Sequence, residues 1–171
     1  MVMPKQAARV DLSFLDALVA RDPFDLLQSA LRSGDIEAAM RLLNSRTRHR
    51  FTAIHRIQPP HMFCALEFDR EQQAVSLNPR PLSAHESYSA VVLATGAPFL
   101  TEFAPLDARL GQHPARNSIV AYVGVPLRTR AGDIRGVLCH YDYRPRAAPR
   151  AEIDAMERAV PVAQSWLLGN A

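Results

Sequence analysis

The stretch AYVGVPLRTRAGDIRGVLCHYD, residues 121–142, contains two extended runs separated by one short polar turn. Both runs are rich in Val, Leu, Ile and Tyr, which favour strands, and the turn RAGD at residues 130–133 carries Gly and Asp. Two such runs around a short turn predict an antiparallel β-hairpin. This hairpin is the feature from which the rest of the fold is worked out.

A second hairpin is predicted upstream of the first. FTAIHRI at residues 51–57 is followed by a proline turn at 58–61 and then by MFCALEFD at 62–69. The last of these runs alternates, with Met62, Cys64, Leu66 and Phe68 on one side of the strand. A short extended piece at 74–77 adds a further strand, so the sequence predicts an antiparallel sheet.

Helices are predicted on both sides of these hairpins in the sequence. Apolar residues recur at helical spacing in residues 11–20, from Pro23 to about 33, and from an Asp35 cap to about 48. A last helix is predicted from about Ala151, and Pro161 within it is expected to kink or split it.

The segment between the hairpins, residues 78–118, has a different character because five prolines and two glycines interrupt it. We predict a short helix at 85–96 that ends at its glycine, a brief strand near 98–103, and otherwise irregular chain. Long irregular segments of compact domains are often functional covers or disordered.

Composition narrows the classes of function. The chain has 171 residues, 48% of them hydrophobic, which fits one globular domain. Its net charge of +3 comes from scattered arginines, and the group Arg46, Arg48, His49 and Arg50 is interpreted as a solvated helix end, so no nucleic-acid partner is expected. With neither a membrane-length apolar run nor a secretory signal, no membrane association and a cytoplasmic location are expected.

Cysteines and histidines give no strong site signal. Cys64 and Cys139 lie in apolar runs without a CxxC pair, so we expect them to be buried and reduced; a redox pair between neighbouring strands is the alternative. The six histidines are dispersed, without an HxH or HxxxH pair, so no metal is expected.

The last third of the chain resembles the GAF domain family. The resemblance rests on the run from Ala121 to Leu127, on Gly132, on the run from Gly136 to Asp142, on Pro145-Arg146, and more weakly on Leu43-Asn44 and Arg50-Phe51-Thr52. It covers about residues 24–168, which leaves 1–23 as an N-terminal tail and extra helix. The family implies an α+β, profilin-like fold. Its antiparallel sheet has the terminal helices on one face and a loop and short-helix cover over a pocket on the other.

The family also implies a range of functions. Its members bind cyclic nucleotides, bilins, haem or small metabolites, or only dimerise, commonly through the terminal helices. The cyclic-nucleotide motif is not found here, and residues 78–118 contain no cysteine for a bilin or for the catalysis of the free-methionine-sulfoxide reductases. The cofactor therefore stays unknown, and a homodimer that acts on a separate effector protein is expected.

Strand parity predicts which residues hold a ligand. In residues 137–142 the polar set with His140 and Asp142 is assigned to the pocket, and Val137, Cys139 and Tyr141 to the helices. Tyr122 and Gly124 share a face of their strand, Gly124 leaving room for a ligand. The predicted ligand-binding residues are His55, Tyr88, His113, Arg116, Tyr122, Gly124, His140 and Asp142, with Asn117 as a further candidate from the cover.

Purely structural roles stay open for several of these residues. His140 and Asp142 could form a surface pair, His55 could be a structural histidine, and Arg116 could serve the loop alone. Three functions follow: a small-molecule sensor, an adaptor whose pocket is filled by Tyr88, Phe99 and Tyr122, and a redox enzyme that uses the two cysteines. The sensor is preferred, and no catalytic group is assigned. The sensor interpretation depends on the parity of residues 137–142.

Overall fold

The computed structural model describes residues 23–83 and 85–169. The tail and the predicted helix at 11–20 lie outside the described residues. One sheet organises the rest, in the order β3-β2-β1-β7-β6-β5, with β4 paired to β2. Its strands are β1 Phe51–Gln58, β2 His61–Asp69, β3 Ala74–Ser76, β4 Arg80–Leu82, β5 Phe99–Thr101, β6 Ala121–Arg128 and β7 Ile134–Asp142.

Both predicted hairpins are confirmed, because β1 pairs with β2 and β6 pairs with β7. Every pairing is antiparallel, and β1 also pairs with β7, which joins the two hairpins at the centre of the sheet. In the β1–β7 pairing Phe51 lies opposite Tyr141 and Thr52 lies opposite His140. Residues opposite each other in a pairing point to the same face of the sheet.

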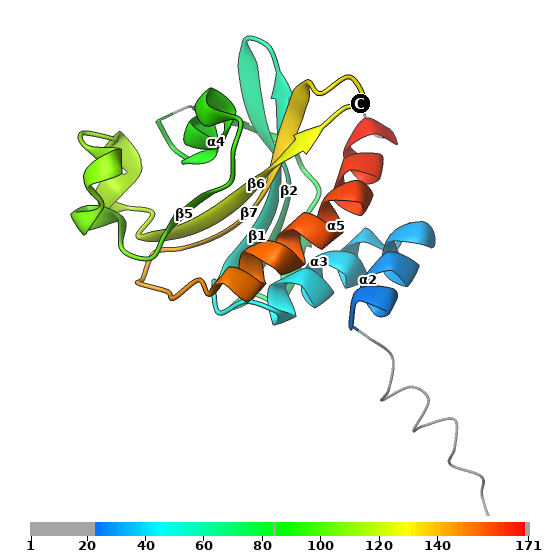
Figure 1. The fold of residues 1–171 in the computed structure, drawn as a ribbon. Helices are drawn as coiled ribbons and strands as arrows, with labels where there is room; N and C mark the ends of the chain where they lie inside the picture. Colours follow the sequence, from blue (N-terminus) through cyan, green and yellow to red (C-terminus); the bar gives the residue numbers. More distant parts are fainter. Residues whose placement is uncertain (1–22, 84, 170–171) are drawn as a thin grey trace, which may run out of the picture.

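Helices from the two ends of the described chain cover one face of the sheet (Figure 1). They are α3 Ile36–Ser45 and α5 Arg150–Gly169, and α2 Pro23–Arg32 packs against these two helices. Met40 of α3 and Met156 of α5 share a core cluster with Ile54, Leu66 and Leu138 of the strands. Burying this apolar surface is the main stabilising contribution of the helical layer.

Pro161 does not split α5, which runs unbroken from Arg150 to Gly169. The proline is exposed, and so is Glu157, whose carbonyl would accept its missing N–H. Water can satisfy that carbonyl, so the helix continues past the proline. The third predicted helix is also shorter than expected, since α3 ends at Ser45 rather than near residue 48.

The proline-rich middle segment lies on the other face of the sheet, as predicted (Figure 1). It contains α4 Ser89–Thr95 and three 3-10 turns, η1 Ala104–Leu106, η2 Ala108–Leu110 and η3 Pro114–Asn117. Its Tyr88, Val92 and Leu110 share a second core cluster with Phe51 and Val137 of the sheet. α4 starts four residues later than predicted and ends at Gly96, whose φ of 65° suits glycine. No helix in the described ranges is long and apolar enough to span a membrane.

Candidate functional site

The predicted parity of β7 is wrong. Cys139 and Tyr141 belong to the cluster beneath the cover, whereas Leu138 belongs to the cluster beneath the helices. His140 and Asp142 therefore point toward the helical layer and cannot line a pocket under the cover. The prediction failed because it assigned polar side chains to a ligand, although a buried hydrogen-bond network can also accommodate them.

His140 is held inside the protein by hydrogen bonds. It is 1% exposed, and its Nδ1 lies 2.7 Å from Oγ1 of Thr52, which also accepts a hydrogen bond from the side-chain amide of Asn44. Burial lowers the pKa of His140 to about 3, so the ring is neutral near pH 7. Its environment is that of a structural histidine.

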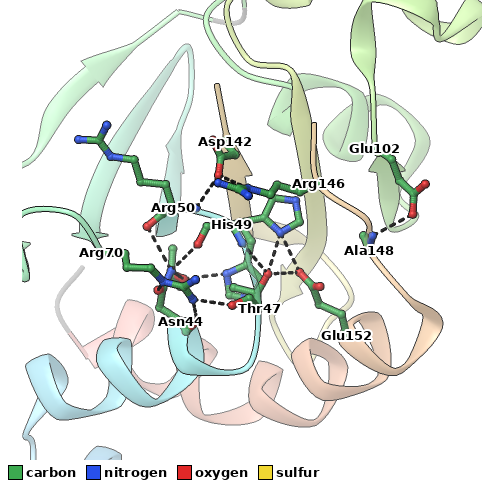
Figure 2. Close-up of polar contacts among 12 residues, drawn as sticks. Asn44, Thr47, His49, Arg50, Arg70, Glu102, Asp142, Arg146, Ala148 and Glu152 are labelled. Carbon is green, nitrogen blue, oxygen red and sulfur yellow. Dashed lines mark hydrogen bonds and ion pairs between the residues drawn. The ribbon is translucent and has the colours of Figure 1, made fainter. Parts of the chain in front are cut away.

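Asp142 organises the chain around the sheet end. One of its carboxylate oxygens accepts a hydrogen bond from Nε of Arg146 at 2.6 Å and from the backbone N–H of Arg50 at 3.1 Å (Figure 2). The other oxygen accepts the backbone N–H of Arg144. The carboxylate thus holds together the start of β1 and the chain that follows β7.

A carboxylate from α5 completes this polar network. Glu152 accepts a hydrogen bond from Thr47 at 2.6 Å and lies 3.1 Å from Nδ1 of His49 (Figure 2). Burial opposes ionisation of Glu152, but the hydrogen bonds with His49 and Thr47 outweigh it, so its pKa lies below the usual value. Arg70 donates from Nε to Oδ1 of Asn44 at 2.7 Å. The network therefore links α3, the strands and α5.

On the cover side, aromatic rings fill the centre of the space above the sheet. Tyr88 and Tyr122 are fully buried and meet edge to face at 5.5 Å, and Phe99 packs against both. The hydroxyl of Tyr88 donates to the carbonyl of Ile119 at 2.9 Å. A Cβ atom on Gly124 would lie 2.5 Å from the hydroxyl oxygen of Tyr122. The room at Gly124 is thus taken by Tyr122, not by a ligand.

His113 and Arg116 brace the cover. Nδ1 of His113 accepts the N–H of Ala115, and its ring lies 4.8 Å from that of Tyr88. Arg116 donates to the carbonyls of Ala104, Pro105 and Gly111. Both side chains hold loops in place, and Asn117 beside them is exposed.

A pocket of about 290 Å³ opens beside this aromatic group, between the sheet and the cover. His55 is the one member of the predicted set that lines it. The other lining residues are Arg80, Leu82, His85, Glu86, Ser87, Pro114, Ala115, Ser118, Ile119, Tyr141 and Tyr143. Sequence reasoning missed Tyr141, although pairing Phe51 with Tyr141 would have placed it on the same face of the sheet as His55. It missed Arg80 because β4 was not predicted.

His55 is a buried polar residue of the pocket wall, as is Ser87. It is 2% exposed, and its Nδ1 lies 2.7 Å from Oγ of Ser89 at the start of α4. Burial lowers its pKa to about 3, with a smaller contribution from the charge of Arg80. A neutral imidazole therefore faces the pocket near pH 7, as a hydrogen-bonding group rather than a charge.

Neither cysteine is set up as a nucleophile. Cys64 and Cys139 are both buried free thiols, and neither lines this pocket. Burial raises the pKa of Cys64 to about 12 and also raises that of Cys139, so both stay protonated near pH 7. Within the described ranges, no group of three or more His, Cys, Asp or Glu side chains could hold a metal ion.

Solved structures of other proteins share this fold. The GAF domain of an Acinetobacter phosphoenolpyruvate-protein phosphotransferase is 12% identical with a TM-score of 0.63, and the match covers 89% of this chain and 99% of that one. The phycoerythrobilin-bound GAF domain of a cyanobacterial phytochrome is 14% identical with a TM-score of 0.63, over 85% of this chain and 94% of that one. The chain has the GAF fold.

The same fold is found in an enzyme. The type II free methionine-R-sulfoxide reductase of Thermoplasma acidophilum is 10% identical with a TM-score of 0.59, over 82% of this chain and 94% of that one. The sequence matches no family model and no curated protein. At these identities the GAF fold is established, whereas a ligand or reaction has to be argued from the site itself.

Proposed function

We propose that this chain is a small-molecule sensor domain that binds its ligand in the pocket lined by His55. The observation that carries the proposal is a pocket on the cover face. Its wall combines apolar and polar side chains and contains the buried imidazole of His55. Ligand sites are typically concave and largely apolar, with a few convergent polar groups. A volume of about 290 Å³ lies at the small end of the usual range, which favours a metabolite over a large chromophore.

β1 and β7 connect the pocket to the helical layer. β1 presents His55 to the pocket and Thr52 to the network below, and β7 likewise presents Tyr141 above and His140 below. The network ends on Glu152 of α5. We propose that the ligand state is passed through α5 to a homodimer partner or a separate effector protein, in the cytoplasm.

An adaptor function without a ligand is the second candidate, and a specific observation favours it. Tyr88, Phe99 and Tyr122 fill the centre of the space between sheet and cover, as that function predicts. The redox alternative has less support because burial keeps both thiols protonated. The pocket beside the aromatic group is what separates the sensor from the adaptor.

Thermal unfolding in the presence of a broad panel of metabolites and nucleotides tests the sensor proposal. A ligand at about 100 times its Kd stabilises the folded state by about 2.7 kcal/mol, which raises the Tm by several degrees. Ser118 is an exposed residue of the pocket rim, so Ser118→Trp should fill the pocket and abolish the shift.

Ser45→Trp, at an exposed position on α3, is the matched control and should keep the shift. A panel in which no compound raises the Tm would favour the adaptor. A shift that survives in Ser118→Trp would place the ligand elsewhere.

A further inference from the structure

A chain of buried hydroxyl groups indicates which atoms of the pocket wall donate hydrogen bonds and which accept them. What we infer from it rests on the proposed function. Tyr122 is fully buried, and its hydroxyl lies 2.8 Å from Oγ of Ser89. Burial raises the pKa of Tyr122 well above its usual value, so the hydroxyl keeps its proton. A buried hydroxyl proton needs an acceptor, and Ser89 supplies it.

One arrangement of hydrogens in which Ser89 satisfies all of its neighbours is the following. Its oxygen also lies 3.2 Å from the hydroxyl of Ser87, which donates to it, and 2.7 Å from Nδ1 of His55. A hydroxyl has two lone pairs and one proton. With Tyr122 and Ser87 donating to the lone pairs, the proton of Ser89 goes to Nδ1 of His55.

In this arrangement His55 is the tautomer that carries its proton on Nε2. A neutral imidazole has one donor nitrogen and one acceptor nitrogen, and here Nδ1 is the acceptor. Sγ of Cys139 lies 3.9 Å from both ring nitrogens, too far for a strong hydrogen bond to either. Among the described residues, the Nε2–H group meets only this sulfur, a weak acceptor, so the pocket wall contains a donor that a ligand can satisfy better.

Arg80 adds a positive charge to the same wall. Its side chain is 51% exposed, and its guanidinium lies 3.5 Å from Glu67, whose same oxygen also accepts from the hydroxyl of Tyr141. A guanidinium has five N–H donors, so one loose contact with Glu67 leaves donors for a second partner. Glu86, the acidic residue of the wall, accepts the backbone N–H of Ser83 at 2.6 Å.

We infer that the pocket selects a small carboxylate, bound through its negative charge to Arg80 and through a hydrogen-bond acceptor to the Nε2–H group of His55. Tyr141 and Tyr143 line the same pocket. The pocket thus distinguishes a carboxylate from its neutral amide of the same shape.

Isothermal titration with two matched pairs of probes tests the inference: benzoate against benzamide, and isobutyrate against isobutyramide. We expect at least one carboxylate to bind about ten- to a hundredfold more tightly than its amide, the ratio typical of a hydrogen bond to a charged group. Arg80→Gln should remove that preference. Arg130→Gln, in the exposed β6–β7 turn, should leave it unchanged.

A second variant tests the hydrogen bond from His55 separately from the charge of Arg80. His55→Phe removes the donor and should weaken the favoured carboxylate about tenfold; its folding is checked by circular dichroism and by the Tm. If that variant does not fold, His55→Asn, which retains an N–H donor, should fold and retain the carboxylate preference.

The outcomes separate this inference from the proposed function. No binding of either carboxylate, equal binding of acid and amide, or a preference that survives in Arg80→Gln overturns the carboxylate assignment. If a compound of the broader panel still raises the Tm and Ser118→Trp abolishes its effect, the sensor proposal stands while this inference fails. If no compound of the panel raises the Tm either, both fail together.

Discussion

Asn44 joins the end of α3 to the start of β1. Its side-chain amide donates to Thr52 at 2.8 Å and to the carbonyls of His49 and Arg50, and its oxygen accepts from Arg70. Because Asn44 is 1% exposed, water cannot replace these bonds. Asn44→Ala should lower the free energy of unfolding by about 2–4 kcal/mol in urea titrations. The exposed Asn117→Ala should stay within about 0.5 kcal/mol of the wild type, and an equal effect of both would contradict this role.

Gly124 provides a second residue-level test. Its Cβ position lies 2.5 Å from the hydroxyl oxygen and 2.7 Å from a ring carbon of Tyr122. Gly124→Ala should therefore destabilise the fold by about 1–3 kcal/mol by displacing that ring. Gly169→Ala, where a Cβ would meet no atom within 4 Å, is the control and should unfold like the wild type. A stable Gly124→Ala protein would show that Tyr122 does not occupy this space.

The sequence identified His55 correctly as a polar member of the cover face but misplaced His140. Both are buried histidines on central strands, each 2.7 Å from a hydroxyl oxygen. Their partners come from residues distant in sequence, such as Ser89 for His55 and Thr52 for His140. Side-chain type alone could not reveal which face held a hydrogen-bond network, because a network and a ligand satisfy polar groups equally well.

At the scale of elements, the hairpins were predictable and β4 was not. β1, β2, β6 and β7 show their strand character through apolar and β-branched residues. β4 is only Arg80–Leu82, with a proline at its centre, and it exists because β2 offers an edge to pair with. A three-residue strand defined by its neighbour leaves no periodicity to detect, and Arg80 of the pocket was missed with it.

The docking of α5 depends on Glu152, whose carboxylate binds Thr47 and lies beside His49. Glu152→Gln keeps the shape of the side chain and removes its charge, which leaves the buried Nδ1–H of His49 with a weaker partner. We expect a loss of about 1–3 kcal/mol in chemical denaturation. Glu157→Gln changes an exposed glutamate on the same helix and should have no measurable effect. Indistinguishable midpoints for the two variants would exclude a role for Glu152 in holding α5.

Because two of its buried histidines have lowered pKa values, we expect the fold to lose stability in acid. His55 and His140 each have a folded pKa of about 3, below the unfolded value of about 6.5. The unfolded state therefore binds more protons below about pH 6.5, and stability falls as the pH drops from there toward 3. Each histidine contributes a slope of up to about 1.4 kcal/mol per pH unit, and the lowered pKa of Glu152 acts in the same direction.

Urea titrations at pH 7, 6 and 5 measure this slope. His140→Gln should reduce it by about 1 kcal/mol per pH unit, since one of the two imidazoles with a lowered pKa is removed. The exposed His61→Gln should leave it unchanged. A slope that is the same in wild type and His140→Gln would mean that His140 accepts a proton in the folded protein as easily as in the unfolded one.

At the scale of the whole molecule, one sheet separates two different environments. The helical face combines an apolar core with the polar network around Asn44 and Glu152, and the cover face combines an aromatic cluster with the pocket at His55. β1 and β7 carry residues of both environments on alternate positions. The sheet therefore offers a short physical connection between the pocket and α5, which the proposed sensor function would use.

A crystal structure of the protein soaked with the compound that most raises its Tm tests this view most directly. We expect density between sheet and cover, in contact with His55 and Tyr141, while His140 stays hydrogen-bonded to Thr52 beneath the helices. Density against His140 or Asp142 on the helical face, with the His55 pocket empty, would contradict it.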